Sequence, residues 1–484
     1  MSRIAASTKK TYPWTTYLII NIFWLGLMTV NQSNGLIVPL LVQRFVGPGR
    51  QATAFGRIRL YSLMVALLVQ AVAGMLSDRS TSRWGRRRPY ILVGTLLNVA
   101  CLVGIGLAPS YGLLFVAVLC SQAAGNIAHG AQQGLIPDLI PESRRGRFSG
   151  VKAVLEIPLP IIVVSFGIGP LVSRGDIWGG LLVAIGVLVT TMLITMLVRE
   201  ERVVEPPPFN WPALGRLLAM TGSFMAIILS GGAAVEWIGR LLEGVTSTTL
   251  LLIAMGLTGL LMMVLAVVLG VWVCVRISLG EKRTGSFTWW VINRLAFLVG
   301  ANSFSTFAVY FFQARLGLEG EAAAGPTARL LMVVGILILI CALLSGWLAD
   351  RIGRKRLVGA SGLLAALGTL ILVLAPSLVM IYVGGAIIGG ATGIFFTSNW
   401  ALGTDIVPKA KSGQFLGISN LAGAGAGAIG GYIGGPLADY FTVRVPQGAG
   451  IGYLLVFGIY GVLFLISTLT LFFVHESHHH THYS

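Results

Sequence analysis

Long runs of apolar residues, separated by short polar stretches, make up most of the chain. A helix that crosses the hydrocarbon core of a bilayer needs roughly 20 predominantly apolar residues. Fourteen segments meet this requirement: 17–41, 58–76, 90–108, 112–136, 150–172, 178–198, 216–238, 249–275, 287–312, 329–348, 357–375, 379–402, 414–436 and 451–474. The pattern therefore predicts an all-α membrane protein with fourteen transmembrane helices.

The composition excludes a water-soluble globular protein. Of the 484 residues, 55% are hydrophobic and 11% are charged, whereas roughly 25% of residues are charged in an average soluble domain. The net charge of +17, from 34 Lys and Arg against 17 Asp and Glu, would indicate a nucleic-acid partner in a soluble chain. In a membrane protein it first raises the question of where the cations lie.

The positive charges predict the orientation of the chain, because cytoplasmic loops collect Lys and Arg. With the N-terminus inside, the inside segments hold 24 cations, the outside segments hold nine, and Arg294 is assigned to a span. We therefore expect a multi-pass protein of the plasma membrane with both termini in the cytoplasm, embedded in the lipid bilayer and without a nucleic-acid partner.

An internal repeat divides the chain into two halves. The stretches GMLSDR (74–79) and GRRR (85–88) recur as GWLADR (346–351) and GRKR (353–356). The same register pairs Asn21 with Asn293, Asp138 with Asp405, and Gly169-Pro170 with Gly435-Pro436. A constant register over this length predicts two six-helix bundles, 1–198 and 287–484, and a linker, 199–286, that carries two extra transmembrane helices.

The repeated loop resembles the signature loop of the major facilitator superfamily. The first copy, SDRSTSRWGRRRPY (77–90), has a lengthened form that resembles the sucrose-transporter branch of the glycoside-pentoside-hexuronide group, and Asn126, Gly130, Asp138 and Leu139 match that branch. The resemblance implies a major facilitator fold whose two bundles rock about a central site.

The resemblance also implies a gating role for the loop residues. A carboxylate at a helix end can accept hydrogen bonds from a neighbouring helix N-terminus, and the contacts would hold the cytoplasmic side shut in the outward-open state. The expected gating residues are Asp78, Arg79, Gly85, Arg86, Asp138, Asp350, Arg351, Gly353, Arg354 and Asp405. The alternative is that the arginines only set topology and bind anionic lipid.

Polar side chains inside four of the spans form the candidate substrate site. A polar stripe in hydrocarbon is costly, so it should face a cavity or partner helices. The expected substrate-binding residues are Asn31, Gln32, Asn34, Gln122, Asn126, His129, Asn302, Asn399 and Trp400. The alternative is that these groups only form hydrogen bonds between helices.

Ionisable residues within the spans are the candidates for ion coupling. Glu156 could meet His129 or neutralise Arg294, and either pair offers a protonation switch, although a static pair is an equal alternative. The sucrose transporters carry an aspartate where this chain has Gln122, and that aspartate is linked to proton coupling. This departure weakens the expectation of proton symport.

The sequence predicts a secondary active transporter that works by alternating access on a sugar, glycoside or similar small polar solute. A drug or lipid exporter of the same superfamily is the alternative within transport, and a non-transporting assembly or pigment-delivery factor is the alternative of another class. No ATP-binding loop or catalytic constellation is present in the sequence, so we expect neither an enzyme nor a metal or cofactor. We expect a monomer with a small-molecule substrate and with a proton or sodium ion as the coupling ion.

Overall fold

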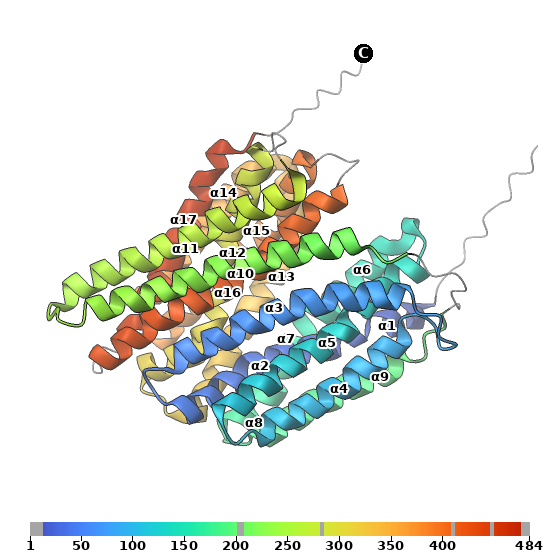
Figure 1. Cartoon of the computed structure of the whole chain (residues 1–484), viewed down its shortest axis with the longest axis horizontal. Helices are drawn as coiled ribbons and strands as arrows, with labels where there is room; N and C mark the ends of the chain where they lie inside the picture. The colour runs from blue at the N-terminus through green and yellow to red at the C-terminus, as the bar shows by residue number, and fades with distance from the viewer. Residues whose placement is uncertain (1–12, 201–207, 281–284, 408–411, 446–449, 476–484) are drawn as a thin grey trace, which may run out of the picture.

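The computed structural model describes residues 13–200, 208–280, 285–407, 412–445 and 450–475. Within these ranges the side chains of 142–146, 350, 412–414, 416, 421 and 422 are not described. The described residues form helices and connecting turns and no strand. Two helical bundles lie side by side with their helices roughly parallel (Figure 1).

The first bundle contains the six spans predicted for the N-terminal half. Its helices are α1 (Trp14–Asn21) with α2 (Phe23–Val46), α3 (Gln51–Asp78), α4 (Arg88–Leu107), α5 (Tyr111–Leu139), the chain of α6 (Glu142–Glu156), α7 (Pro158–Ile162), η1 (Val163–Ile168) and α8 (Gly169–Ser173), and α9 (Ile177–Thr195). Several helices begin at a side-chain cap: the carboxylate of Asp176, for example, accepts a hydrogen bond from the backbone N–H of Gly179 at the start of α9 (2.7 Å).

The second bundle has the same plan. Its helices are α12 (Gly285–Leu316), η2 (Gly320–Ala323) with α13 (Ala324–Ile352), α14 (Arg354–Leu374), α15 (Leu378–Ile406), α16 (Ser412–Arg444), and α17 (Ile451–Thr470) with η4 (Leu471–Phe473). Thirteen helical stretches of described residues are long and apolar enough to cross a membrane. The helix α16, with 33 residues, occupies the place of the remaining predicted span, 414–436.

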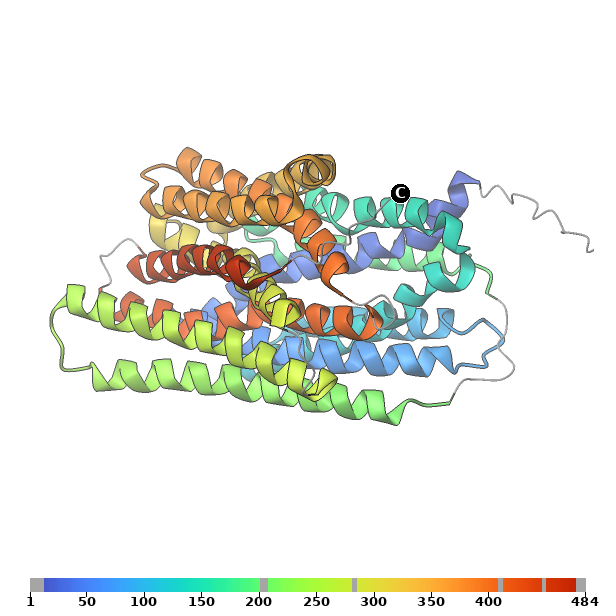
Figure 2. The same ribbon diagram turned by 90° about the horizontal axis from the view of Figure 1, so that it is seen from above.

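Two further helices, α10 (Trp211–Leu241) and α11 (Thr248–Leu279), separate the bundles in the sequence. They pack against each other and against α16, and α10 also contacts α3 (Figures 1 and 2). The pair therefore lies along one face of the molecule, where it covers the line along which the two bundles meet. The fourteen-helix fold class predicted from the sequence is confirmed.

The fifth span is the least regular. Its helix breaks at Ile157, before Pro158, and continues through a π-helical segment, Val163–Ile168. Proline has no N–H to donate and clashes with the preceding turn, so a break at this point is expected. The irregular span packs against α13 of the other bundle.

The two bundles meet most closely near one end of the helices. We call this end the far side, because Pro13 and His475, where the described chain begins and ends, lie at the opposite end, the terminal side. Gly56 of α3 lies against the backbone of Gly431 of α16: a Cβ atom at Gly56 would be 2.4 Å from the carbonyl oxygen of Gly431. Glycine at both positions lets the two backbones touch.

Candidate functional site

A cavity of about 490 Å³ lies between the two bundles. Polar side chains from helices of both bundles line it: Asn31, Gln32 and Asn34 on α2, Arg59 and Ser62 on α3, Gln122 on α5, and Asn302 and Ser305 on α12. The structure thus brings together Asn31, Gln32, Asn34, Gln122 and Asn302, which lie far apart in the sequence. Amide groups donate and accept hydrogen bonds, so the cavity suits a ligand with polar groups of both kinds.

Arg59 is the lining residue that the sequence analysis missed. It is the second residue of the predicted span 58–76, where a cation is expected to belong to the preceding loop. In the structure it is within α3, and its guanidinium lies against Gly427 of α16: a Cβ atom there would be 3.1 Å from an Arg59 terminal nitrogen. The structure therefore places a second cation, besides Arg294, inside a membrane-spanning helix. The position of Arg59 inside the predicted span 58–76 is the feature of the sequence that could have identified it as a cavity residue.

Other predicted substrate residues are already hydrogen-bonded within the protein. The side chain of Asn399 is fully buried; its oxygen accepts from Arg294 (3.1 Å) and its nitrogen donates to Asn293 (2.8 Å). The amide nitrogen of Asn126 donates to the backbone oxygen of Gln122 on the preceding turn (2.8 Å). The Asn399 side chain thus joins α15 to α12, whereas the Asn126 bond lies within α5. A substrate role for either residue stays a prediction.

Trp400 is 37% exposed, and its ring faces the guanidinium carbon of Arg294 at 5.3 Å from the ring centroid. Together with the hydrogen bond to Asn399, this contact holds Arg294 without a carboxylate partner among the described residues. Neither pairing expected for Glu156, with His129 or with Arg294, is present as an ion pair between these residues.

Glu156 instead pairs with Lys152 on the same helix, with 3.2 Å between the ammonium nitrogen and a carboxylate oxygen. The Lys152 ammonium lies 4.0 Å from the ring centroid of the buried Trp24, and His129 packs edge-on against the same ring at 5.0 Å. One His129 nitrogen is 3.1 Å from the amide nitrogen of Gln133. Lys152, Trp24 and His129 thus form one cluster that connects Glu156 to the first and fourth spans.

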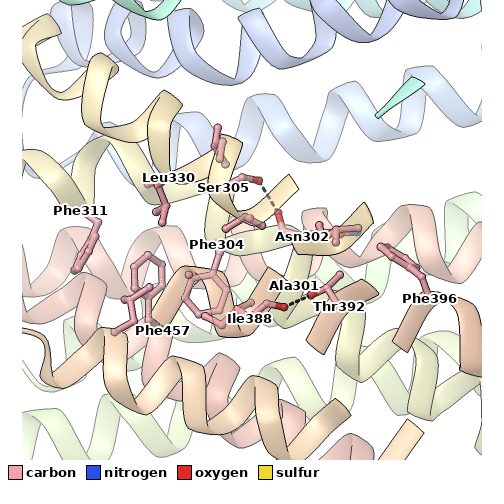
Figure 3. Close-up of a pocket in the computed structure, with 16 residues that line it drawn as sticks. Ala301, Asn302, Phe304, Ser305, Phe311, Leu330, Ile388, Thr392, Phe396 and Phe457 are labelled. Carbon is pink, nitrogen blue, oxygen red and sulfur yellow. Dashed lines mark hydrogen bonds between the residues drawn. The ribbon is translucent and has the colours of Figure 1, made fainter. Parts of the chain in front are cut away.

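An apolar pocket of about 110 Å³ adjoins the cavity on the side of the C-terminal bundle. Phe304, Phe311, Phe396 and Phe457 contribute aromatic rings to it (Figure 3). Ala301, Asn302 and Ser305 line both the pocket and the cavity. A ligand in the cavity can therefore extend an apolar portion between α12, α13 and α15.

The far side of the cavity is closed by contacts between the bundles. The carboxylate of Asp439 on α16 accepts hydrogen bonds from the backbone N–H groups of Ala52 (3.1 Å) and Thr53 (2.7 Å) at the start of α3. A carboxylate is favoured there, because the first N–H groups of a helix lack partners within the helix and carry partial positive charge.

Further polar contacts join the bundles at the same end. Polar groups on α2 and α3 meet polar groups of the second bundle in these pairs: Arg44 with Glu321 (2.9 Å), Gln43 with Gln313 (2.8 Å), Gln51 with Tyr453 (3.0 Å), and the backbone oxygen of Pro39 with the Tyr310 hydroxyl (2.7 Å). The structure is therefore closed to solutes arriving from the far side.

The first signature loop forms an ion-pair cluster on the terminal side. Arg87, which the sequence analysis did not select, is its centre: it pairs with Asp78 at the end of α3 and with Asp138 at the end of α5 (2.8 Å). Arg86 also pairs with Asp138. The backbone N–H groups of Arg87 and Arg88 donate to Glu200, beyond the end of α9 (2.8 and 3.0 Å). In this structure the loop thus joins helices of one bundle.

Charge and burial act in opposite directions on this cluster. Burial lowers the pKa of Arg87, but the hydrogen bond and charge of Asp138 and the charge of Asp78 outweigh that effect and raise the pKa above its usual value. Burial raises the pKa of Glu200, and the backbone N–H donors from Arg87 and Arg88 offset this only in part. The cluster therefore keeps Arg87 fully charged.

The second copy of the loop repeats one pairing. Arg354 pairs with Asp405, as Arg86 pairs with Asp138 at the equivalent place in the first bundle. Gly85 and Gly353 both have a positive φ, of 96° and 98°, which favours glycine at this turn. The equivalence supports the repeat found in the sequence.

The remaining loop residues have separate partners. Arg79 lies over Phe209 (5.9 Å from the ring centroid) and Arg351 lies over Trp347 (3.9 Å). The side chain of Asp350 lies outside the described part of the structure. The gating role of these residues stays a prediction.

Comparison with known proteins agrees with this architecture. Residues 295–483 match the family model of the Major Facilitator Superfamily. The chain is 31% identical over 206 residues to the Multidrug resistance protein MdtG of Salmonella dublin, an alignment that covers 42% of this chain. It spans about half of that relative, 47% of its length.

Solved transporter structures share the fold over nearly the whole chain. A D-xylose-proton symporter superposes with a TM-score of 0.65 at 18% identity, covering 96% of this chain and 99% of the symporter. The nucleoside transporter NupG gives a TM-score of 0.63 at 12% identity, covering 94% and 98%. The family model thus matches the C-terminal part of this chain, and the solved transporters share its fold.

Proposed function

We propose that the chain is a secondary transporter that moves a small organic solute across the plasma membrane by alternating access. The observation that carries the proposal is the polar cavity between two bundles that meet closely at the far side. A binding site between two bodies that can rock about it is what alternating access requires.

In this proposal the halves 1–198 and 287–484 move relative to each other, and the substrate contacts Asn31, Gln32, Asn34, Gln122 and Asn302. Asn126, Asn399 and Trp400 position the helices around it, together with Arg294. With both termini in the cytoplasm, the far side, where the two bundles are in contact, is the extracellular side.

We propose two substrate classes, each with its own support. The amide side chains that line the cavity favour a sugar or glycoside. The resemblance of the first signature loop to the sucrose-transporter branch favours the same class. The aromatic pocket beside the cavity favours a solute with an apolar portion, as does the similarity to MdtG, whose name describes it as a multidrug resistance protein. This second class corresponds to a drug exporter.

Flux through purified protein in proteoliposomes tests the proposal. Labelled sugars, glycosides and drugs are offered with an imposed proton gradient, an imposed sodium gradient or no gradient. Saturable flux of a panel member that the Asn302→Leu variant abolishes, and that the Gly186→Ala variant retains, supports transport through the cavity. Gly186 is a suitable control, because a Cβ atom there would meet no atom within 4 Å. Flux in neither direction across the whole panel would contradict the proposal.

A further inference from the structure

The central cavity carries one unbalanced positive charge. Among the described residues that line it, Arg59 is the charged one, and no carboxylate of the described chain forms an ion pair with it. The carboxylates on adjoining helices are engaged elsewhere: Glu236 with Arg57, Asp439 with the start of α3, and Glu321 with Arg44. A cation held away from bulk water without a counter-charge is costly, and a bound anion removes that cost.

The neighbouring Arg57 shows that the fold supplies a partner where an arginine points away from the cavity. Its guanidinium is 3.3 Å from the carboxylate of Glu236 of α10, and the pair is partly exposed. Two residues further along α3, Arg59 emerges on another face of the helix, toward the cavity. The two arginines differ in their surroundings and not in their type, which makes them a matched pair for experiment.

The space around the Arg59 guanidinium is suited to an anionic group. Gly427 opposite it has no side chain, which leaves room for the terminal nitrogen, because a Cβ atom at Gly427 would be 3.1 Å from it. A guanidinium presents a planar fork of donors that matches the two oxygens of a carboxylate or the oxygens of a sulfonate or phosphate. The amides of Asn34 and Gln122 line the same cavity and can bond neighbouring polar atoms.

The aromatic pocket gives the same cavity an apolar end. It opens from the wall formed by Ala301, Asn302 and Ser305, which also lines the cavity, and it is bounded by Phe304 and Phe457 (Figure 3). Arg59 is on α3 of the first bundle, whereas this pocket lies among helices of the second. One ligand that reaches both would touch both bundles.

We infer that the cavity binds an amphipathic organic anion, whose acidic group pairs with Arg59 and whose apolar portion occupies the aromatic pocket. The inference rests on the proposed function where it takes this anion to be the cargo. It narrows both substrate classes, because a neutral sugar leaves Arg59 unpaired and a cationic drug is repelled by it. An anionic lipid shares this chemistry with a free organic anion.

The alternative role for Arg59 is purely structural. Its Cβ lies 3.8 Å from the position that a Cβ atom at Gly431 would occupy, so the side chain also packs along the α3–α16 interface. A packing role predicts that Arg59 variants change stability or conformation without regard to the charge of the ligand. Ligand charge therefore discriminates the two roles.

Three probes of different charge test the inference: the anion 2-naphthoate, its neutral analogue 2-naphthalenemethanol and the cation 2-naphthylmethylammonium. Their binding is measured with full-length protein in phosphatidylcholine nanodiscs. We expect the wild type to bind 2-naphthoate at least about tenfold more tightly than the alcohol, since hydrogen bonds to charged groups contribute on that scale. Arg59→Gln should remove this preference while binding of the alcohol is kept, Arg59→Lys should keep part of it, and Arg57→Gln should leave it unchanged. Phe304→Ala should weaken binding of the acid and the alcohol alike.

Equal binding of the three probes by the wild type would overturn the inference, and this comparison does not depend on whether any variant folds. An unchanged acid preference in Arg59→Gln would overturn it as well. Nanodiscs that contain phosphatidylglycerol separate the two sources of the anion: Arg59-dependent loss of 2-naphthoate binding assigns the site to a lipid headgroup, and unaltered binding assigns it to a free anion.

Failure of this inference can be distinguished from failure of the transport proposal. Arg59-dependent binding of 2-naphthoate without flux of any solute in proteoliposomes supports the inference and contradicts transport. Flux of neutral sugars that Arg59→Gln leaves unchanged supports transport and contradicts the inference.

Discussion

The carboxylate of Asp439, near the end of α16, accepts a hydrogen bond of 2.7 Å from the backbone N–H of Thr53, in the first turn of α3. The two residues belong to different bundles, so this helix cap is also a contact across the interface.

Asp439→Asn should weaken closure of the far side. An N-cap carboxylate contributes about 0.5–2 kcal/mol, so the closed population should fall roughly two- to thirtyfold relative to the open one. Distances between spin labels at Arg50 and Glu319, both exposed on the far side, report this equilibrium. Asp176→Asn is the matched control, because Asp176 caps α9 within one bundle. A distance distribution identical to that of the wild type in Asp439→Asn would refute the closing role of this contact.

Gly56→Ala should open the same interface by a steric route. Its Cβ atom would approach the carbonyl oxygen of Gly431 to 2.4 Å, and a backbone atom has no rotamer by which to move away. Overpacking of this kind costs about 1–3 kcal/mol, so the α3–α16 contact should separate and the Arg50–Glu319 distance should lengthen. Gly186→Ala, with open space around the new methyl group, should leave the distance unchanged. A shift in both variants would mean that the effect is not specific to the interface.

Asn399 and Asn302 should respond differently to truncation. Asn399→Ala removes the acceptor of Arg294 and the donor to Asn293, and it should destabilise the protein by about 1–3 kcal/mol because buried polar partners are left unpaired. Asn302 lines the cavity, and its hydrogen bond with the hydroxyl of Ser305 uses its backbone oxygen, not its side-chain amide. Asn302→Ala should therefore keep the thermal unfolding midpoint of the detergent-solubilised protein and reduce solute binding. Loss of stability in Asn302→Ala, together with loss of solute binding but not of stability in Asn399→Ala, would contradict these two roles.

Glu156→Gln should change how transport depends on pH if the pair with Lys152 couples a proton to the solute. Loss of the carboxylate charge leaves the Lys152 ammonium, which lies over Trp24 beside His129, without its counter-charge. We expect flux in the variant to lose the response to an imposed proton gradient that the wild type shows. Glu319→Gln, at an exposed position on the far side, is the control. A proton response that is the same in Glu156→Gln and in the wild type would remove Glu156 from coupling.

The helices were predictable because they depend on local properties of the sequence. Apolar runs long enough to span a bilayer appear as helices, and the pairing of Arg86 with Asp138 recurs as that of Arg354 with Asp405. The polar positions of the cavity were also visible, because polarity inside an apolar run is rare.

The ion-pair and hydrogen-bond partners of the polar side chains were not predictable from the sequence, because they depend on how the helices pack. The sequence places Arg57 and Arg59 two residues apart, and only the position of α10 and of the cavity separates an ion-paired arginine from an unpaired one. Asn399 and Asn302 are equally polar in the sequence, yet the first is buried in a hydrogen-bond network. The preference of Glu156 for Lys152 over His129 likewise follows from how the fifth span is placed.

The central claim is that solute crosses the membrane through the cavity and that opening of the far side is a step in transport. Arg44 and Glu321 contact each other across the closed far side at 2.9 Å. Both can be replaced by cysteine in a background in which Cys101, Cys120, Cys274 and Cys341 are changed to serine, and the two new thiols can then be joined by a short reducible bifunctional reagent. Solute flux in proteoliposomes, measured before joining, after joining and after reduction, tests the claim. The account predicts that joining abolishes flux and that reduction restores it. Flux that continues at the same rate with the far side joined would contradict the account.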